Sequence, residues 1–204
     1  MREALGIFLS FSSKEALALE QIVHIKLLMR CIHKFQKKSE KKGADLMTVY
    51  RQLLAKATRV NLNLEEALEL KDPRKRQGLA SNFSQILTTV AFLEDGLDDF
   101  EPVEKLLQSL KTVTSNYAQY LNPRDMSEVV AAVCKLSIQA KKASKKHSNP
   151  IKFEKELRLL AKRSALMLAA MNKKSQDIVV DHFEQIDFYD ADFTEAMKRL
   201  KMIK

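Results

Sequence analysis

The stretch from Gly78 to Leu121 has apolar residues at the spacing of one helical stripe. The steps alternate between four and three residues, which is typical of a helix that packs against another helix along its length. After Glu101–Pro102 the phase shifts by one residue, as expected where a proline removes a backbone donor and bends a helix. The pattern predicts a long helix over 74–121 with a bend near residue 102. The stripe before the bend comprises Leu79, Phe83, Ile86, Val90, Leu93, Leu97 and Phe100.

A similar stripe runs from Ile25 to Ala67, with its polar interruptions confined to the part between Gln36 and Gly43. Ser12 and Glu15 form a capping box, in which each side chain satisfies a backbone N–H at the start of a helix. These features predict one helix over 13–70, about 80 Å long at a rise of 1.5 Å per residue. We therefore divide the chain into an N-terminal segment, 1–12, and one helical domain, 13–200.

Three prolines follow a residue that favours the N-cap position, at Asp72–Pro73, Asn122–Pro123 and Asn149–Pro150. Proline suits the first turn of a helix, so each pair predicts a helix start. The further helices are then expected over 124–147 and 150–176, with the last one running on towards residue 200. Only four glycines and four prolines interrupt 204 residues, which favours an all-α fold without strands.

The chain carries a formal net charge of +9, which favours a polyanionic partner. Twelve basic residues but only two acidic ones lie between Lys135 and Lys174. Helices that end at His147 and begin at Pro150 would place many of these lysines around one hairpin tip. A solvated helical face is the alternative explanation. The candidate membrane-binding residues in this part of the chain are Lys135, Lys141, Lys142, Lys145, Lys146, Lys152, Lys162 and Arg163.

A second basic run is the weaker candidate. Folding the chain back at Asp72 would place this run beside an acidic run over 94–104, so pairing within the chain is favoured over binding. The run comprises Lys34, Lys37, Lys38, Lys41 and Lys42.

Catalytic and metal-binding motifs are not found in the sequence. The glycines are too far apart for a phosphate-binding loop, and no histidine follows a glutamate at the spacing of a di-iron helix. Cys31 and Cys134 are isolated, so we expect buried, inert thiols in a reducing compartment. We expect no enzyme, no cofactor and no metal. No window approaches about 18 uninterrupted apolar residues, so any membrane contact is expected to be peripheral and the protein cytoplasmic.

Specific stretches resemble a BAR domain. The run from Lys75 to Leu79 followed by Phe83 is similar to the opening of a BAR second helix, and Glu101–Pro102 to its bend. Asn149–Pro150, followed by Glu154, Glu156 and Leu157, is similar to the start of the third helix. Within that superfamily, the chain resembles the chibby-interacting BAR-domain proteins of the ciliary base. It departs from the pattern at Asn122–Pro123, which adds a second break, and in a third helix about two turns short.

The resemblance implies an elongated, antiparallel three-helix coiled coil with a kinked middle helix. Two such chains would form a homodimer that buries the seam from Gly78 to Phe100 and the middle of the first helix. Lysines on the concave side and at the tips would bind anionic phospholipid, so the expected function is to sense or shape membrane curvature without a cofactor. A chibby-like coiled-coil protein is the implied protein partner, and the centriole or ciliary base the implied location.

Two other function classes compete with this expectation. In a compact helical-bundle adaptor without membrane activity, the apolar seams would be buried inside one protomer. Nucleic-acid binding is disfavoured, because Phe153 is the only aromatic residue between Lys135 and Lys174 that could stack on bases. The acidic and aromatic segment 181–195 is expected to cap the bundle or to contact a partner.

Overall fold

The computed structural model describes residues 72–91, 111, 114–115, 117–144, 152–200 and 202, and all of its regular structure there is helical. The all-α expectation is confirmed for this part of the chain. The helix expected over 13–70 and the bend expected near residue 102 lie outside the described residues.

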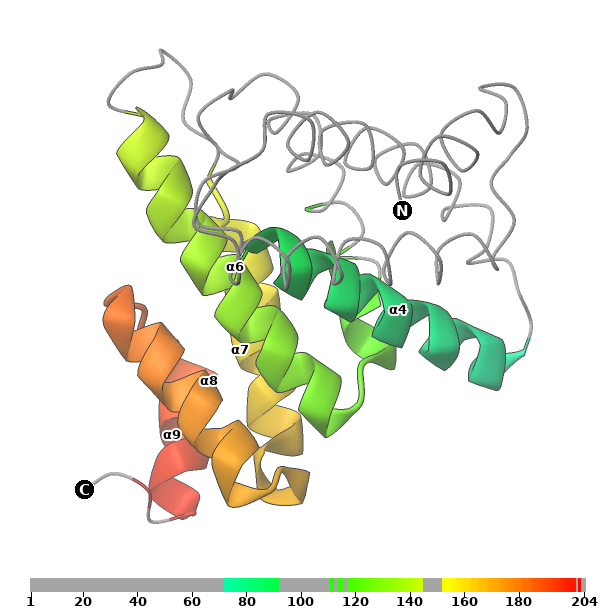
Figure 1. Ribbon diagram of the computed structural model, residues 1–204. Helices are drawn as coiled ribbons and strands as arrows, with labels where there is room; N and C mark the ends of the chain where they lie inside the picture. The colour runs from blue at the N-terminus through cyan, green and yellow to red at the C-terminus, as the bar shows by residue number, and fades with distance from the viewer. Residues whose placement is uncertain are drawn as a thin grey trace.

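Three helices begin at a constant spacing of 50 residues. They are α4 (Pro73–Ala91), α6 (Pro123–Ser144) and α8 (Lys173–Gln185), shown in Figure 1. A side-chain oxygen caps each start at 2.9 Å: Asp72 accepts from the Arg74 N–H, Asn122 from that of Asp125 and Asn172 from that of Ser175. The helix starts predicted at Asp72–Pro73 and Asn122–Pro123 are confirmed.

The approach to α6 and the approach to α8 share one backbone pattern. A 3-10 turn, η1 (Ala118–Tyr120) or η2 (Leu168–Ala170), is followed by an extended residue, Leu121 or Met171, and then by the capping asparagine. Both extended residues are buried, with 4% and 5% of their surface exposed. The same local structure therefore occurs at two places 50 residues apart, a recurrence of the kind found in helical repeat proteins.

The helices form two layers. The front layer contains α4, α6 and α8, in which α6 lies between the other two (Figure 1). The back layer contains α7 (Glu154–Met167), which packs on α6, and α9 (Ala191–Arg199), which packs on α7. Stacked pairs of helices in two layers are the architecture of helical repeat arrays.

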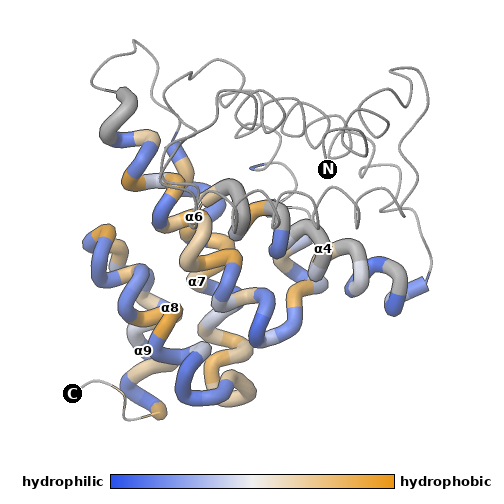
Figure 2. Tube along the Cα trace, viewed as in Figure 1, coloured by the Kyte–Doolittle hydropathy of each residue, from blue (hydrophilic) through white to orange (hydrophobic). Residues whose placement is uncertain are grey.

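Helix α6 is the centre of the core. Its apolar residues point to several sides of the helix rather than to one stripe, which is the pattern of a helix surrounded by others. Figure 2 shows this mixed hydropathy along α6 beside its neighbours. Each fully buried aliphatic side chain contributes about 1.5–3 kcal/mol to stability. The α6 side chains with no more than 1% of their surface exposed are Met126, Ser127, Val129, Val130, Ala132, Val133, Cys134 and Leu136.

The prediction of one continuous third helix over 150–176 and beyond is wrong. The described helix α7 begins at Glu154 rather than at Pro150, and α8 and α9 are separate helices. Extended backbone at Met171 and the Asn172 cap end the first of these segments. The second break contains Asp187 with φ at 54°, and Asp190 caps α9 by accepting from the backbone N–H groups of Asp192 and Phe193. Short helices fold back here, where one long rod was expected.

The acidic and aromatic segment 181–195 packs on the core. This agrees with the expectation that it caps the bundle. Phe183 and Phe193 are buried, and their ring centroids are 5.1 Å apart in an edge-to-face arrangement. Phe188 packs on Phe183 at 5.5 Å. Such aromatic pairs add about 0.5–1.5 kcal/mol beyond the burial of their area, so they fasten α9 to α8.

The repeated caps give a testable expectation for stability. Asn172→Ala removes one capping acceptor and should lower the free energy of unfolding by about 1 kcal/mol. Asn122→Ala should cost more, because the Asn122 amide also donates to the buried Asp125 carboxylate at 2.7 Å and that group would lose its partner. Urea unfolding followed by circular dichroism measures both. The matched Asn172→Ser variant retains a capping hydroxyl and should stay near wild type, and an equal loss in Ser and Ala variants would contradict this role of the cap.

Candidate binding groove

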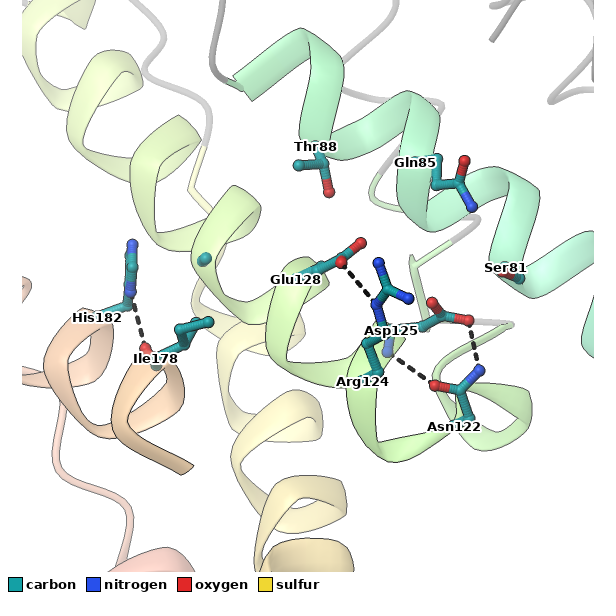
Figure 3. A pocket seen from close by; sticks show the side chains of 10 residues that line it. Ser81, Gln85, Thr88, Asn122, Arg124, Asp125, Glu128, Ile178 and His182 are labelled. Carbon is teal, nitrogen blue, oxygen red and sulfur yellow. Dashed lines mark hydrogen bonds and ion pairs between the residues drawn. The ribbon is translucent and has the colours of Figure 1, made fainter. Parts of the chain in front are cut away.

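A groove of about 530 Å³ crosses the front layer and takes residues from all three of its helices (Figure 3). Most of the lining side chains are polar, and several are half-exposed. We call this the front groove. It is lined by Ser81, Gln85 and Thr88 of α4, by Asn122, Arg124, Asp125, Glu128 and Ala131 at and in the start of α6, and by Ile178 and His182 of α8.

Helix α4 contributes one polar stripe to the front groove. Ser81, Gln85 and Thr88 follow steps of four and three, so they share one face of the helix. The adjacent face carries the buried Ser84 and Leu87. The Thr88 hydroxyl donates to the Ser84 carbonyl at 2.7 Å, so its oxygen lone pairs remain acceptors for a ligand in the groove. When α4 buries its Ser84 and Leu87 face, the adjacent face with its hydroxyl and amide groups therefore lies along the groove.

The first turns of α6 supply the charged groups. Arg124 Nε donates to Glu128 Oε1 at 3.3 Å, one turn apart, on the exposed side of the helix. Asp125 is buried and engaged by Asn122. The groove lining thus contains one guanidinium and two carboxylates, which gives it no positive excess.

Helix α8 presents His182 on the other side of the groove. Its Nδ1 lies 2.8 Å from the backbone oxygen of Ile178, and a carbonyl only accepts hydrogen bonds. The proton of the neutral ring is therefore on Nδ1, and Nε2 is left as an acceptor. In Figure 3 the ring extends away from the Ile178 carbonyl, so the second ring nitrogen lies at its free end.

None of the expected membrane-binding residues that the structure describes lines the front groove. Lys141, Lys152 and Lys162 are exposed, whereas Lys135 and Arg163 are half-buried. Lys141 lies near the end of α6 and Lys152 just before α7, so they flank the predicted tip. Lys142 is in α6, but its side chain lies outside the described residues. So do Lys145, Lys146, Lys34, Lys37, Lys38, Lys41 and Lys42.

The expected dimer seam also falls largely outside the described part. Leu79, Phe83, Ile86 and Val90 are in α4, but their side chains are not among those described. Leu93, Leu97 and Phe100 lie outside the described residues altogether. The described buried face of α4 is the neighbouring one, Ala80, Ser84, Leu87 and Ala91. It joins the core around α6, where Gln139 Nε2 donates to the Ala91 carbonyl at 3.4 Å.

Cys134 has the inert character expected from the sequence. It is buried in α6, and burial raises the pKa of its thiol to about 12, so the reactive thiolate is scarce near neutral pH. Burial, followed by the neighbouring Tyr120, raises the pKa of Tyr117 to about 12. Cys31 lies outside the described residues.

The described residues contain neither a metal-binding cluster nor a membrane-spanning helix. No three side chains among His, Cys, Asp and Glu lie where they could share a metal ion in that part of the chain. None of its helices combines the length and apolar character needed to cross a membrane.

Comparison with known proteins gives no match for this chain among protein-family models, curated proteins or solved structures.

The residues of the front groove were not predicted from the sequence. One signal could have found them, namely the recurrence of a capping residue and a helix start at Asp72–Pro73, Asn122–Pro123 and Asn172–Lys173. A recurrence at a fixed period indicates helices stacked in register, and their shared face is then the candidate binding surface.

Proposed function

We propose that the chain is a non-catalytic scaffold that binds an extended polar segment of a protein partner along the front groove. One observation supports this above the others: the groove crosses three successive front-layer helices, and each helix contributes side chains to it. Stacked helical units make extended binding surfaces of this kind. The proposal corresponds to the adaptor alternative that the sequence left open.

The size of the groove suits a short stretch of extended peptide. Packed helices lie 8–10 Å apart, so three neighbouring helices span about 20 Å between the outer axes. An extended chain rises about 3.3 Å per residue, so about six residues fit across the front layer. The groove volume of about 530 Å³ is also in the range of ligand sites, roughly 300–1,000 Å³.

The chemistry of the lining favours a peptide over a phosphate-rich partner. Nucleic acid and phospholipid head groups are held mainly by Lys and Arg, and the groove lining offers only Arg124, beside the carboxylates of Asp125 and Glu128. A peptide backbone presents both donors and acceptors. Gln85 carries both kinds of group, whereas Thr88 oxygen and His182 Nε2 can accept. We therefore do not assign the excess positive charge of the chain to ligand binding in the front groove.

Selection from a library tests the proposal without a known partner. Random displayed peptides of about 12 residues, roughly twice the span of the groove, are selected against the full chain. We expect enriched sequences whose affinity, measured by fluorescence anisotropy, falls at least about tenfold in Gln85→Ala/Thr88→Val and in His182→Ala, since each removes groups that would hydrogen-bond the ligand. Lys198→Ala, at an exposed position of α9, is the matched control and should bind as wild type. Equal binding by all variants, or no enrichment, would refute the groove.

The resemblance to BAR domains supports a second candidate function, peripheral binding to anionic membranes by a BAR-like dimer at the ciliary base. The observation that favours it is the exposure of Lys141 and Lys152, at the two ends of the α6–α7 connection. Each lysine close to an anionic surface contributes about 1 kcal/mol, so several of them together could hold a membrane without insertion. Neither Lys141 nor Lys152 lines the front groove.

Co-sedimentation with phosphatidylserine liposomes tests this second candidate. Reversing Lys141, Lys142, Lys145 and Lys146 to Glu should abolish sedimentation at low salt, and helicity should be retained because lysine side chains are rarely part of a buried core. The same reversal at Lys37, Lys38, Lys41 and Lys42 is the matched comparison. If that second variant loses the liposomes and the first one keeps them, the tip is not the contact. The front-groove variants should sediment like wild type.

A further inference from the structure

A second recess, of about 550 Å³, lies between α7 and α9 in the back layer. The lining residues of each helix follow the i, i+3, i+4, i+7 spacing of a single helical face, so one face of each helix forms a wall. We call it the back trough. It is lined by Lys162, Ala165, Leu166 and Ala169 of α7 and its η2 extension, and by Asp192, Glu195, Ala196, Arg199 and Leu200 of α9 and its C-cap.

Within the back trough, two exposed leucine side chains protrude beside a hollow that is lined by alanines. Leu166 is 79% exposed and Leu200 is 40% exposed, which makes them two of the three most exposed large apolar side chains in the described part of the chain. Ala165, Ala169 and Ala196 leave room next to them because their side chains are small. Burying one such leucine fully would contribute about 1.5–3 kcal/mol, so a partner that covers it gains a substantial driving force.

The charges of the trough balance one another. Two basic residues, Lys162 and Arg199, line it together with two acidic residues, Asp192 and Glu195. Within α9, Arg199 Nε donates to Glu195 Oε1 at 3.2 Å in an exposed pair one turn apart, so a partner copy would compete with this pair. The chain as a whole has a net charge of +9, whereas this patch is neutral. An anionic membrane or nucleic acid would meet as many carboxylates as cations here. A surface with equal and opposite charges is instead complementary to a second surface of the same kind.

We propose that the back trough is an interface with a second copy of this chain, related by a two-fold axis. In a two-fold interface the same patch serves both partners, so a protrusion and a recess must lie side by side, as Leu166 and the alanines do. Each Leu166 enters the alanine-lined recess of the other copy, and the basic groups of one copy face the acidic groups of the other. The arrangement is independent of the front groove, which opens on the other layer.

Because the back trough consists of two short helical faces, we expect the dimer to bury about 1,200 Å² of accessible surface in total, at the low end of the range for specific complexes. The dimer should therefore dissociate on dilution, and its strength should respond to single changes at the trough. Sedimentation velocity of the full chain over a range of concentrations measures this. Leu166→Glu should raise the dimer dissociation constant at least about tenfold, because it places a charge in the apolar recess. Tyr189→Ser, at a residue that is 73% exposed and does not line the trough, should leave the constant unchanged.

A charge-swap pair separates direct pairing from damage to the fold. The basic variant carries Asp192→Lys and Glu195→Lys, and the acidic variant carries Lys162→Glu and Arg199→Glu. Each should fail to self-associate, since like charges would face one another, whereas an equimolar mixture of the two should form a heterodimer. Circular dichroism confirms that both variants are folded. If both self-associate as wild type, or if the mixture stays monomeric, the proposal is overturned.

The expected seam of the BAR-like dimer gives the competing explanation for self-association. Leu93→Asp alters that seam and leaves the back trough unchanged. A dimer that survives Leu166→Glu but not Leu93→Asp would be held by the seam, and the back-trough proposal would be wrong. A wild-type chain that stays monomeric at every concentration would overturn it as well. Neither result bears on peptide binding in the front groove, which the display experiment tests separately.

Discussion

The burial of α6 on several sides is the constraint on which the rest of the described structure depends. Ser127, Val129 and Ala132 lie on different sides of the helix, and each has no more than 1% of its surface exposed. One neighbour could cover only one face, so α4, α7 and α8 must all pack against α6. That requirement produces two layers and brings helices 50 residues apart into contact. It leaves the front groove across α4, the first half of α6 and α8.

Comparison of equivalent positions 50 residues apart shows where α8 differs from α6. Positions 50 residues apart keep the same role at the cap, Asn122 and Asn172, and in the core, Val129 and Val179. On the side away from the core the pattern changes: Asp177, Asp181 and Glu184 stand where α6 has the buried Ser127, Ala131 and Cys134. The outward face of α8 can therefore meet water, as the outer face of a capping unit does in helical arrays.

The sequence pattern predicted those features that depend on neighbouring residues alone, namely two helix starts and the helical class. Asp72–Pro73 and Asn122–Pro123 gave two helix starts, and the lack of glycine and proline gave the all-α class. The break at Asn172 escaped prediction because no proline follows it and the apolar Met171 keeps the periodicity of the flanking segments. The front groove escaped because periodicity shows which face of a helix is buried but not which helices meet. Gln85 and His182 come together only through packing of both their helices on α6.

The most direct test of the account is a nuclear magnetic resonance titration of the isotope-labelled chain with a peptide selected on it. If the front groove is the binding site, the resonances that shift should include Gln85 in α4, Glu128 in α6 and His182 in α8, because one ligand would contact all three helices. Signals of α9, such as that of Lys198, should stay unchanged. Shifts confined to one helix, or centred on α9, would contradict a groove shared by the front-layer helices.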